Sequence, residues 1–390
     1  MALNVYSEKG IPIDQQSESF QKITEKPIDA GATDAYTKTR IAWMWGTENE
    51  QWNFYHNFSR CTDNEEIKQA IAQIRRTEDQ QRSRIGFFFD PRASVLENTI
   101  TIEQLAVDLT AAMAKDEPDP YIKQALDFGL LEDFDHLFRY SVLMSRLEGK
   151  DANKIVEGRT DIKPGRPTAQ EHLHPLDTVR KHPSRTATDP LSVVHVMSIT
   201  APEQQTREYY NSHGYLFKEE EARQLYAEIG EIEEQHVTHY ESLLDPNFSL
   251  LEMAFLHEYN EVYDYYCCLQ METDPRFKPV WEHHLQEELG HVRVMGSLLQ
   301  KYEGKSPEQL MPSQLPKLLV IQPAKEYVNQ VLATQVDLRA SGKQFVPKDQ
   351  LPRDWPSYRY LETIGASSAP STRFERMEQG GMQGGASRGA

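Results

Sequence analysis

The sequence predicts an all-α fold, and three observations support this prediction. Helical periodicity recurs from about residue 63 to 303, strand signals are few throughout, and several helix ends carry capping residues. The chain has 390 residues, of which 38% are hydrophobic. That length and composition suit one large domain or two ordinary ones, with polar segments attached to a packed core.

Composition also excludes several classes of protein. Lysine and arginine number 42 against 60 aspartates and glutamates, which gives a net charge of −18. An acidic surface of this kind repels phosphate backbones, so we do not expect nucleic-acid binding. Three cysteines are too few for a disulfide scaffold or a four-cysteine metal site. Neither a secretory signal nor an apolar run long enough to span a membrane is visible, which predicts a soluble, cytoplasmic protein.

Periodicity and composition divide the chain into four regions, at 1–118, 119–197, 198–303 and 304–390. The first region lacks sustained periodicity over 1–60, then carries helical patterns near 63–83 and 101–115, and should pack onto the core. The fourth region is a C-terminal extension with one expected helix near 323–337. Its end, residues 365–390, is rich in glycine and serine and should be disordered.

The second and third regions contain the best-marked helices. A long helix should begin after Asp119, which precedes a proline, and end at Gly149. Residues 150–197 are dense in proline, glycine, threonine and aspartate, and a connection this long without structure of its own is often functional. The third region is strongly helical with short breaks, and Ser249 with Glu252 forms a capping box at the start of one helix.

The third region contains a repeat, in which a second copy follows the first at one constant offset and without a gap. Each copy reads Glu-x6-Tyr followed by Glu-x2-His, and the spacing between the two glutamates is the same in both copies. The matched pairs are Glu203 with Glu258, Tyr210 with Tyr265, Glu233 with Glu288, and His236 with His291. The glutamates lie inside the apolar stripes of their helices, so four carboxylates should face the interior of one bundle.

Four buried carboxylates need compensation, because burying even one unpaired charge costs several kcal/mol. Two divalent cations would neutralise all four and would also use the two imidazoles. The Glu-x2-His spacing places both side chains on one helical face, and the distances from the helix ends bring all the ligands to one level. The alternative is a metal-free bundle whose carboxylates pair with arginine or stay protonated.

This pattern resembles the ferritin-like di-metal carboxylate superfamily, and its motif style is similar to that of rubrerythrin-type proteins. The resemblance covers 198–303 and implies a ferritin-like four-helix bundle with additional N-terminal helices and irregular flanking segments. Carried onto this sequence, the resemblance implies that Glu233 and Glu288 bridge the metals and that Glu203 and Glu258 are terminal ligands. It implies one nitrogen ligand per metal, from His236 and His291. Tyr210 and Tyr265 would support the carboxylates.

Several other polar residues are weaker candidates. Glu261 could add a ligand, but we expect it at the edge of the bundle. Glu132 and His136 could approach the site if their helix covers the bundle, although packing or surface exposure is the simpler expectation. Packing or exposure is also expected for His172 and His174 in the long loop, for His239 and His257 beside the proposed ligands, and for Cys267 and Cys268.

Carboxylates with one imidazole per metal suit iron or manganese, whereas structural zinc favours thiolates. The sequence therefore predicts two iron ions, with manganese as the alternative, and an oxidoreductase that reacts with O2 or H2O2. No rubredoxin-like cysteine pair is present, so an external electron donor is expected, and a homodimer is compatible with the pattern. The alternatives are a ferroxidase or iron-binding protein without an organic substrate, a dimanganese catalase, and a metal-free helical scaffold.

Overall fold

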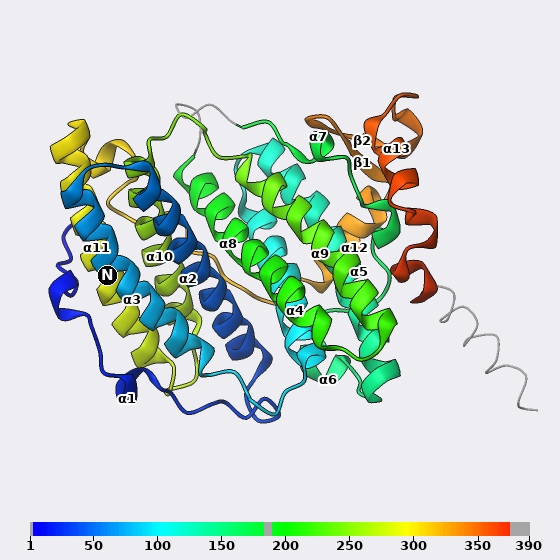
Figure 1. The fold of residues 1–390 in the computed structure, drawn as a ribbon, viewed down its shortest axis with the longest axis horizontal. Coiled ribbons are helices and arrows are strands. Elements are labelled where there is room, and N and C mark those ends of the chain that lie inside the picture. The colour runs from blue at the N-terminus through cyan, green and yellow to red at the C-terminus, as the bar shows by residue number, and fades with distance from the viewer. Residues whose placement is uncertain (1–2, 183–188, 375–390) are drawn as a thin grey trace, which may run out of the picture.

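The computed structural model describes residues 3–182 and 189–374, and it confirms the all-α fold. Eight long helices of the described residues form two four-helix groups that lie side by side (Figure 1). The terminal bundle consists of α2 (Ala35–Cys61), α3 (Glu65–Gly86), α10 (Leu250–Met271) and α11 (Lys278–Glu303). The central bundle consists of α4 (Val95–Asp116), α5 (Pro120–Glu148), α8 (Pro190–His213) and α9 (Glu220–Glu241).

Each bundle is assembled from two helical hairpins that are nested along the chain. The hairpins α2–α3, α4–α5, α8–α9 and α10–α11 each join helices that are consecutive among the long ones. The first hairpin packs against the last, and the second packs against the third. The structure thus differs from the single bundle predicted over 198–303, because α8–α9 and α10–α11 belong to different bundles. The sequence pattern fixes which face a hairpin buries, but not which other hairpin covers that face.

All of helix α2 except its last residue lies within residues 1–60, where the sequence shows no sustained periodicity. Its N-cap is Asp34, whose side chain accepts a hydrogen bond from the backbone N–H of Thr37. The helix packs on α3 and α10 in its own bundle and on α4 and α8 in the other. Because it is enclosed on most sides, polar residues such as Thr47 and Asn49 are buried together with its apolar ones. A helix buried all round has no apolar stripe for a sequence pattern to detect.

The two bundles meet closely where α2 crosses α8. A Cβ atom placed on Gly46 would lie 2.9 Å from the Cα of Pro202, so only glycine fits at this crossing. Within the terminal bundle, the guanidinium of Arg40 on α2 donates to both carboxylate oxygens of Glu272, at 2.9 and 2.8 Å. Glu272 also accepts from the indole N–H of Trp281 at 3.0 Å, which fixes the ends of α10 and α11 against α2.

The helix ends follow the expected local chemistry. The carboxylate of Asp119 accepts from two backbone N–H groups at the start of α5, and Gly149 ends that helix with a φ of 63°. Ser249 and Glu252 form the predicted capping box of α10. These local signals are strong because they depend on neighbouring residues only.

The C-terminal extension first runs along α10 of the terminal bundle, where Tyr259 and Tyr263 donate to the backbone carbonyls of Pro312 and Lys317, and its later part packs on the central bundle. Helix α12 (Lys325–Gln335) confirms the helix predicted near 323–337, and an antiparallel hairpin of β1 (Leu338–Ser341) and β2 (Gln344–Pro347) follows it, then α13 (Pro356–Thr363). The segment 365–390 was predicted to be disordered, but its first residues are packed against the rest of the protein. Ser371 donates to Glu228, and Phe374 is buried. The remainder of this segment, 375–390, lies outside the described residues. The short helices are α1 (Phe20–Ile23), α6 (Asn153–Val156) and α7 (Pro175–Thr178).

Candidate metal centres

Cluster 1 lies in the core of the central bundle and combines four carboxylates with two imidazoles. Its members are Glu103 from α4, Asp133 and His136 from α5, Glu203 from α8, and Glu233 and His236 from α9. Each side chain is at most 2% exposed. Their ligand atoms form two overlapping groups that share Asp133 and Glu233, and the atoms of each group lie within 4.8 Å of one another. Each group adds one further glutamate and one histidine, so two adjacent cations can share two carboxylates and gain one imidazole each.

The two histidines of cluster 1 are oriented alike. His236 points Nδ1 toward the carboxylates of Asp133 and Glu233, at 3.2 and 3.1 Å, while its Nε2 lies 2.9 Å from Glu132. His136 points Nδ1 toward Glu233 at 3.0 Å, and its Nε2 lies 3.7 Å from Glu171. An imidazole with one nitrogen on the ligand set and the other on a carboxylate is typical of metal-binding histidines.

The long connection after α5 lies against cluster 1 and contacts the carboxylates that surround it. Arg166 is fully buried, and its guanidinium lies 3.2 Å from Glu132 and 3.8 Å from the ring centre of Phe128. The carboxylate of Asp135 holds this segment in place, because it accepts from the backbone N–H groups of Gly165 and Thr168 at 2.8 and 2.9 Å. The part of this connection near Arg166 is therefore packed against the site.

Cluster 2 occupies the corresponding place in the terminal bundle. Its members are Glu48 from α2, Glu78 from α3, Glu258 and Glu261 from α10, and Glu288 and His291 from α11. Each is at most 2% exposed. The Nδ1 atom of His291 lies 3.0 Å from Glu78, 3.2 Å from Glu258 and 2.8 Å from Glu288. Among the described residues, no lysine or arginine forms an ion pair with these five glutamates.

Glutamines complete the surroundings of cluster 2. The far nitrogen of His291 donates to the side-chain oxygen of Gln16 at 2.7 Å, which leaves Nδ1 facing the carboxylates. Gln81 donates its amide to Glu288 at 2.6 Å and to Glu287 at 3.2 Å. The second helix of each of the other three hairpins carries an acid-x2-His motif. In the α2–α3 hairpin, Gln81 takes the place of the histidine, two residues being left between it and Glu78. Cluster 2 therefore has one imidazole where cluster 1 has two.

The predicted tyrosines contact cluster carboxylates across the hairpins. The hydroxyl of Tyr210 on α8 donates to Glu103 on α4. The hydroxyl of Tyr265 on α10 donates to Glu48 on α2, and Tyr55 on α2 donates in return to Glu258. These tyrosines fix the orientation of Glu103, Glu48 and Glu258.

Burial and mutual repulsion shift the protonation equilibria of both clusters. Burial raises the pKa of Glu78 and of Glu258 to about 7, and it raises the pKa of Glu203 well above its ordinary value. Burial alone would lower the pKa of His236, but Glu203 and the other carboxylates around it raise that pKa well above the usual range. Glu78 is fully buried, and its Oε2 has no hydrogen bond. Without cations, the clusters therefore need bound protons to limit their negative charge.

The structure divides the six predicted ligands between the two clusters. Glu203, Glu233 and His236 lie in cluster 1. The matching residues Glu258, Glu288 and His291 lie in cluster 2. The single shared centre expected from the repeat is therefore not formed, because the ligands of each copy face an N-terminal hairpin, although α8 of one copy also contacts α10 of the other.

The partners that sequence analysis missed extend the same repeat toward the N-terminus. Glu48 and Glu78 are separated by the same interval as the two glutamates of each copy, and so are Glu103 and Asp133. The pair Glu103 and Asp133 follows the pair Glu48 and Glu78 at the same sequence offset that separates the two copies of the repeat in 198–303. His136 follows Gln81 at this offset as well. The spacing was available in the sequence. The replacement of glutamate by aspartate and of histidine by glutamine concealed it.

The weaker candidates are placed as follows. Glu261 is buried in cluster 2 and not at a bundle edge. Glu132 and His136 are both buried at cluster 1, against the expectation of packing or surface exposure. Outside both clusters lie His172 near Glu228, His174 at the start of α7, His239 beside Phe128, His257 stacked on Phe54, and the buried free cysteines Cys267 and Cys268.

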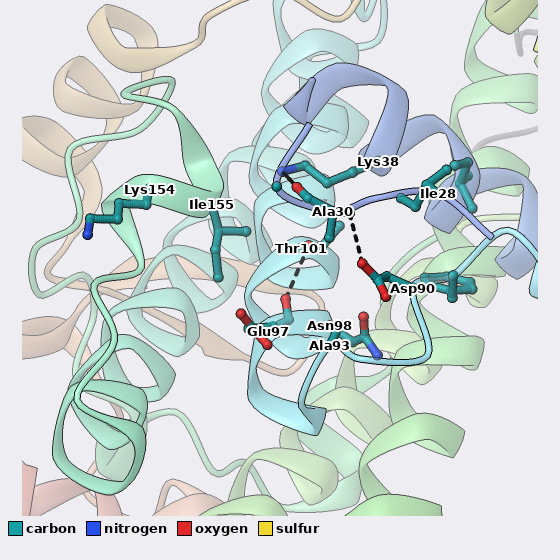
Figure 2. Close-up of a pocket in the computed structure, with 13 residues that line it drawn as sticks. Ile28, Ala30, Lys38, Asp90, Ala93, Glu97, Asn98, Thr101, Lys154 and Ile155 are labelled. Carbon is teal, nitrogen blue, oxygen red and sulfur yellow. Dashed lines mark hydrogen bonds between the residues drawn. The ribbon is translucent and has the colours of Figure 1, made fainter. Parts of the chain in front are cut away.

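Two pockets of the structure have linings that include no residue of either cluster. One, of about 200 Å³, lies between the start of α2, α4 and α6 (Figure 2). Asp90, one of the residues that line this pocket, accepts a hydrogen bond from the backbone N–H of Ala30 at 3.0 Å (Figure 2). The other, of about 480 Å³, lies at the boundary of the bundles and is lined by Glu50, Thr200 and His257 among others. The clusters themselves are enclosed in the helix cores.

Comparisons with protein-family models, with curated proteins and with solved structures find no match for this chain. The interpretation of the site therefore depends on its own geometry. Within residues 3–182 and 189–374, no helix combines the length and the apolar composition needed to cross a bilayer.

Proposed function

We propose that this chain is a di-metal carboxylate protein similar to the ferritin-like superfamily, and that cluster 1 holds two iron ions that react with O2 or H2O2. One observation carries the proposal. The two ligand groups of cluster 1 overlap at Asp133 and Glu233, and each includes one histidine whose other nitrogen faces a carboxylate. Such an arrangement, with a carboxylate from each of two helices and an acid-x2-His motif from each of the other two, suits a pair of cations.

The donor set favours iron or manganese. Each of the two positions offers carboxylate oxygens with one imidazole, a combination that suits these metals, whereas no cysteine belongs to the cluster. Two ferrous ions bound there would supply the electrons that reduce O2 or peroxide. The burial of cluster 1 restricts the reactant at the metals to a small molecule such as these, because every member is at most 2% exposed.

The protein's own residues orient the ligands and balance their charge. Glu132 faces Nε2 of His236, so the opposite nitrogen, Nδ1, is directed at Asp133 and Glu233, the two carboxylates that the ligand groups share. Arg166 offsets the charge of Glu132, and the hydroxyl of Tyr210 holds Glu103 in one orientation. The segment that carries Arg166 closes the cluster against water, which strengthens every electrostatic interaction inside it.

Elemental analysis after anaerobic loading with Fe2+ tests the proposal. We expect the double variant Asp133→Asn/Glu233→Gln to bind about two fewer ions per chain than the parent, because both carboxylates that belong to the two ligand groups are lost. We also expect it to lose the consumption of O2 or H2O2. Glu231→Gln is the matched control, since Glu231 lies on the same helix and is exposed.

Equal metal content in parent and double variant, with both folded by circular dichroism, would contradict the proposal. The readout also separates the alternatives. Release of O2 from H2O2 by the manganese-loaded protein would identify a catalase, and oxidation of Fe2+ without turnover of an organic compound would identify a ferroxidase. A folded parent that binds no metal would be a scaffold.

A second variant tests the role of the carboxylate behind His236. Glu132→Gln keeps the size of the side chain but removes the charge that faces Nε2. We expect metal affinity at cluster 1 to fall by roughly 10- to 100-fold, as is typical when such a partner is lost. Competition with a chelator of known affinity measures the change, and unchanged affinity would show that Glu132 serves packing alone.

A further inference from the structure

The two ligand groups of cluster 2 differ in chemistry, unlike those of cluster 1. One group combines Glu78, Glu258 and Glu288 with the imidazole of His291. The other consists of Glu48, Glu78 and Glu261, which are carboxylates only. The two groups share Glu78, so they define two adjacent positions, one with a nitrogen donor and one with oxygen donors alone.

Gln81 is the reason that the second position lacks a nitrogen donor. The other three hairpins carry a histidine at this place, whereas the amide nitrogen of Gln81 is a donor that already contacts Glu288 at 2.6 Å. The remaining polar atom of Gln81 is its side-chain oxygen, which is buried and has no hydrogen bond. Any ligand that this side chain offers is therefore another oxygen.

Unpaired buried oxygens indicate that the all-carboxylate position is built for a cation. Both carboxylate oxygens of Glu261 lack a hydrogen bond although the side chain is 2% exposed. In the fully buried Glu78, Oε1 lies 3.0 Å from Nδ1 of His291 and Oε2 has no hydrogen bond. One oxygen of Glu48 is also unpaired, while its other oxygen accepts from Tyr265. Buried oxygens without donors are rare and need a partner, and here they converge within 4.8 Å.

We infer that the position formed by Glu48, Glu78 and Glu261 binds a hard divalent cation of the Mn2+ type, so that cluster 2 is a mixed centre. Oxygen-only donor sets suit Mn2+, Mg2+ and Ca2+, whereas the neighbouring position with His291 suits the same metals as cluster 1. The inference goes beyond the proposed function, since it concerns the other bundle and requires no reaction at cluster 1.

The test uses the full chain and its Asp133→Asn/Glu233→Gln variant, each loaded anaerobically with equal concentrations of Fe2+ and Mn2+. Bound Mn2+ is counted by electron paramagnetic resonance and elemental analysis. We expect Mn2+ to remain bound in that variant, and Glu261→Gln to weaken it by roughly tenfold or more. We expect Gln81→His, which adds the missing imidazole, to shift the bound ratio toward iron by roughly tenfold. Glu282→Gln, an exposed acid on α11, is the control.

Mn2+ binding that Glu261→Gln leaves unchanged would overturn the inference, and so would an iron-to-manganese ratio that Gln81→His leaves unchanged. Gln81→His keeps the test decisive if Glu261→Gln does not fold. Displacement of Mn2+ by Mg2+ would support an oxygen-only donor set and would name its occupant. Loss of all Mn2+ in the Asp133→Asn/Glu233→Gln variant would also overturn it. Metal lost from cluster 2 alone would leave the proposed function standing.

Discussion

The metal-free protein should lose stability as the pH rises from about 5 to 8, and bound cations should abolish this loss. Burial raises the pKa of Glu78 and Glu258 from 4.5 to about 7, so the folded state holds protons that the unfolded chain releases. Stability therefore falls with increasing pH, by about 3 kcal/mol for each of these two groups. His291 also makes stability fall with increasing pH. Its pKa is raised in the folded state, so the stabilisation that its imidazolium proton gives is lost when this proton dissociates.

Thermal unfolding of the chelator-treated and metal-loaded protein at pH 5, 6.5 and 8 measures this effect. Cations replace the protons at the carboxylates, so the loaded protein should keep its stability at pH 8. The metal-free variant Glu78→Gln/Glu258→Gln is the control, and its stability should depend less on pH. A metal-free parent that is as stable at pH 8 as at pH 5 would contradict the shifted protonation equilibria.

The second large effect is expected from Arg166→Met. This guanidinium is fully buried, and its ionic partner is Glu132 at 3.2 Å. Removing it leaves a buried carboxylate without its cation, so we expect the free energy of unfolding to fall by about 3–5 kcal/mol. Urea unfolding of the metal-loaded variant measures the loss.

A surface pair and a double variant control this experiment. Arg207 pairs with Glu234 near the surface, and Arg207→Met should cost no more than about 1 kcal/mol. Arg166→Met/Glu132→Leu removes both buried charges and should recover much of the lost stability. If the double variant were as unstable as Arg166→Met, the ion pair would not be the origin of the effect.

The sequence predicts features that depend on neighbouring residues. The ends of α5, the capping box of α10 and the apolar faces that carry Glu203 or Glu288 are all of this kind. Each requires only that residues one to four positions apart share a turn or a helical face. The grouping of Glu203, Glu233 and His236 was accessible for the same reason, since one hairpin contributes all three.

The pairing of hairpins could not be predicted in this way. Four hairpins with similar buried faces can combine in several arrangements, and the choice depends on contacts far apart in the sequence, such as Gly46 against Pro202. Asp133 was missed because it breaks the glutamate pattern. The helix α2 was missed because enclosure by two bundles removes the amphipathic signal.

The nested order of the hairpins also sets the order in which the clusters can form during synthesis. All four helices of the central bundle have been made once the chain reaches Glu241, whereas the terminal bundle needs α11, which ends at Glu303. Domains tend to fold as units while the chain grows. Cluster 1 can thus be assembled while Glu48 and Glu78 still await the hairpin that carries Glu258 and His291. During that interval the acidic face of α2 and α3 stays in water, where its charges are hydrated and carry no burial cost.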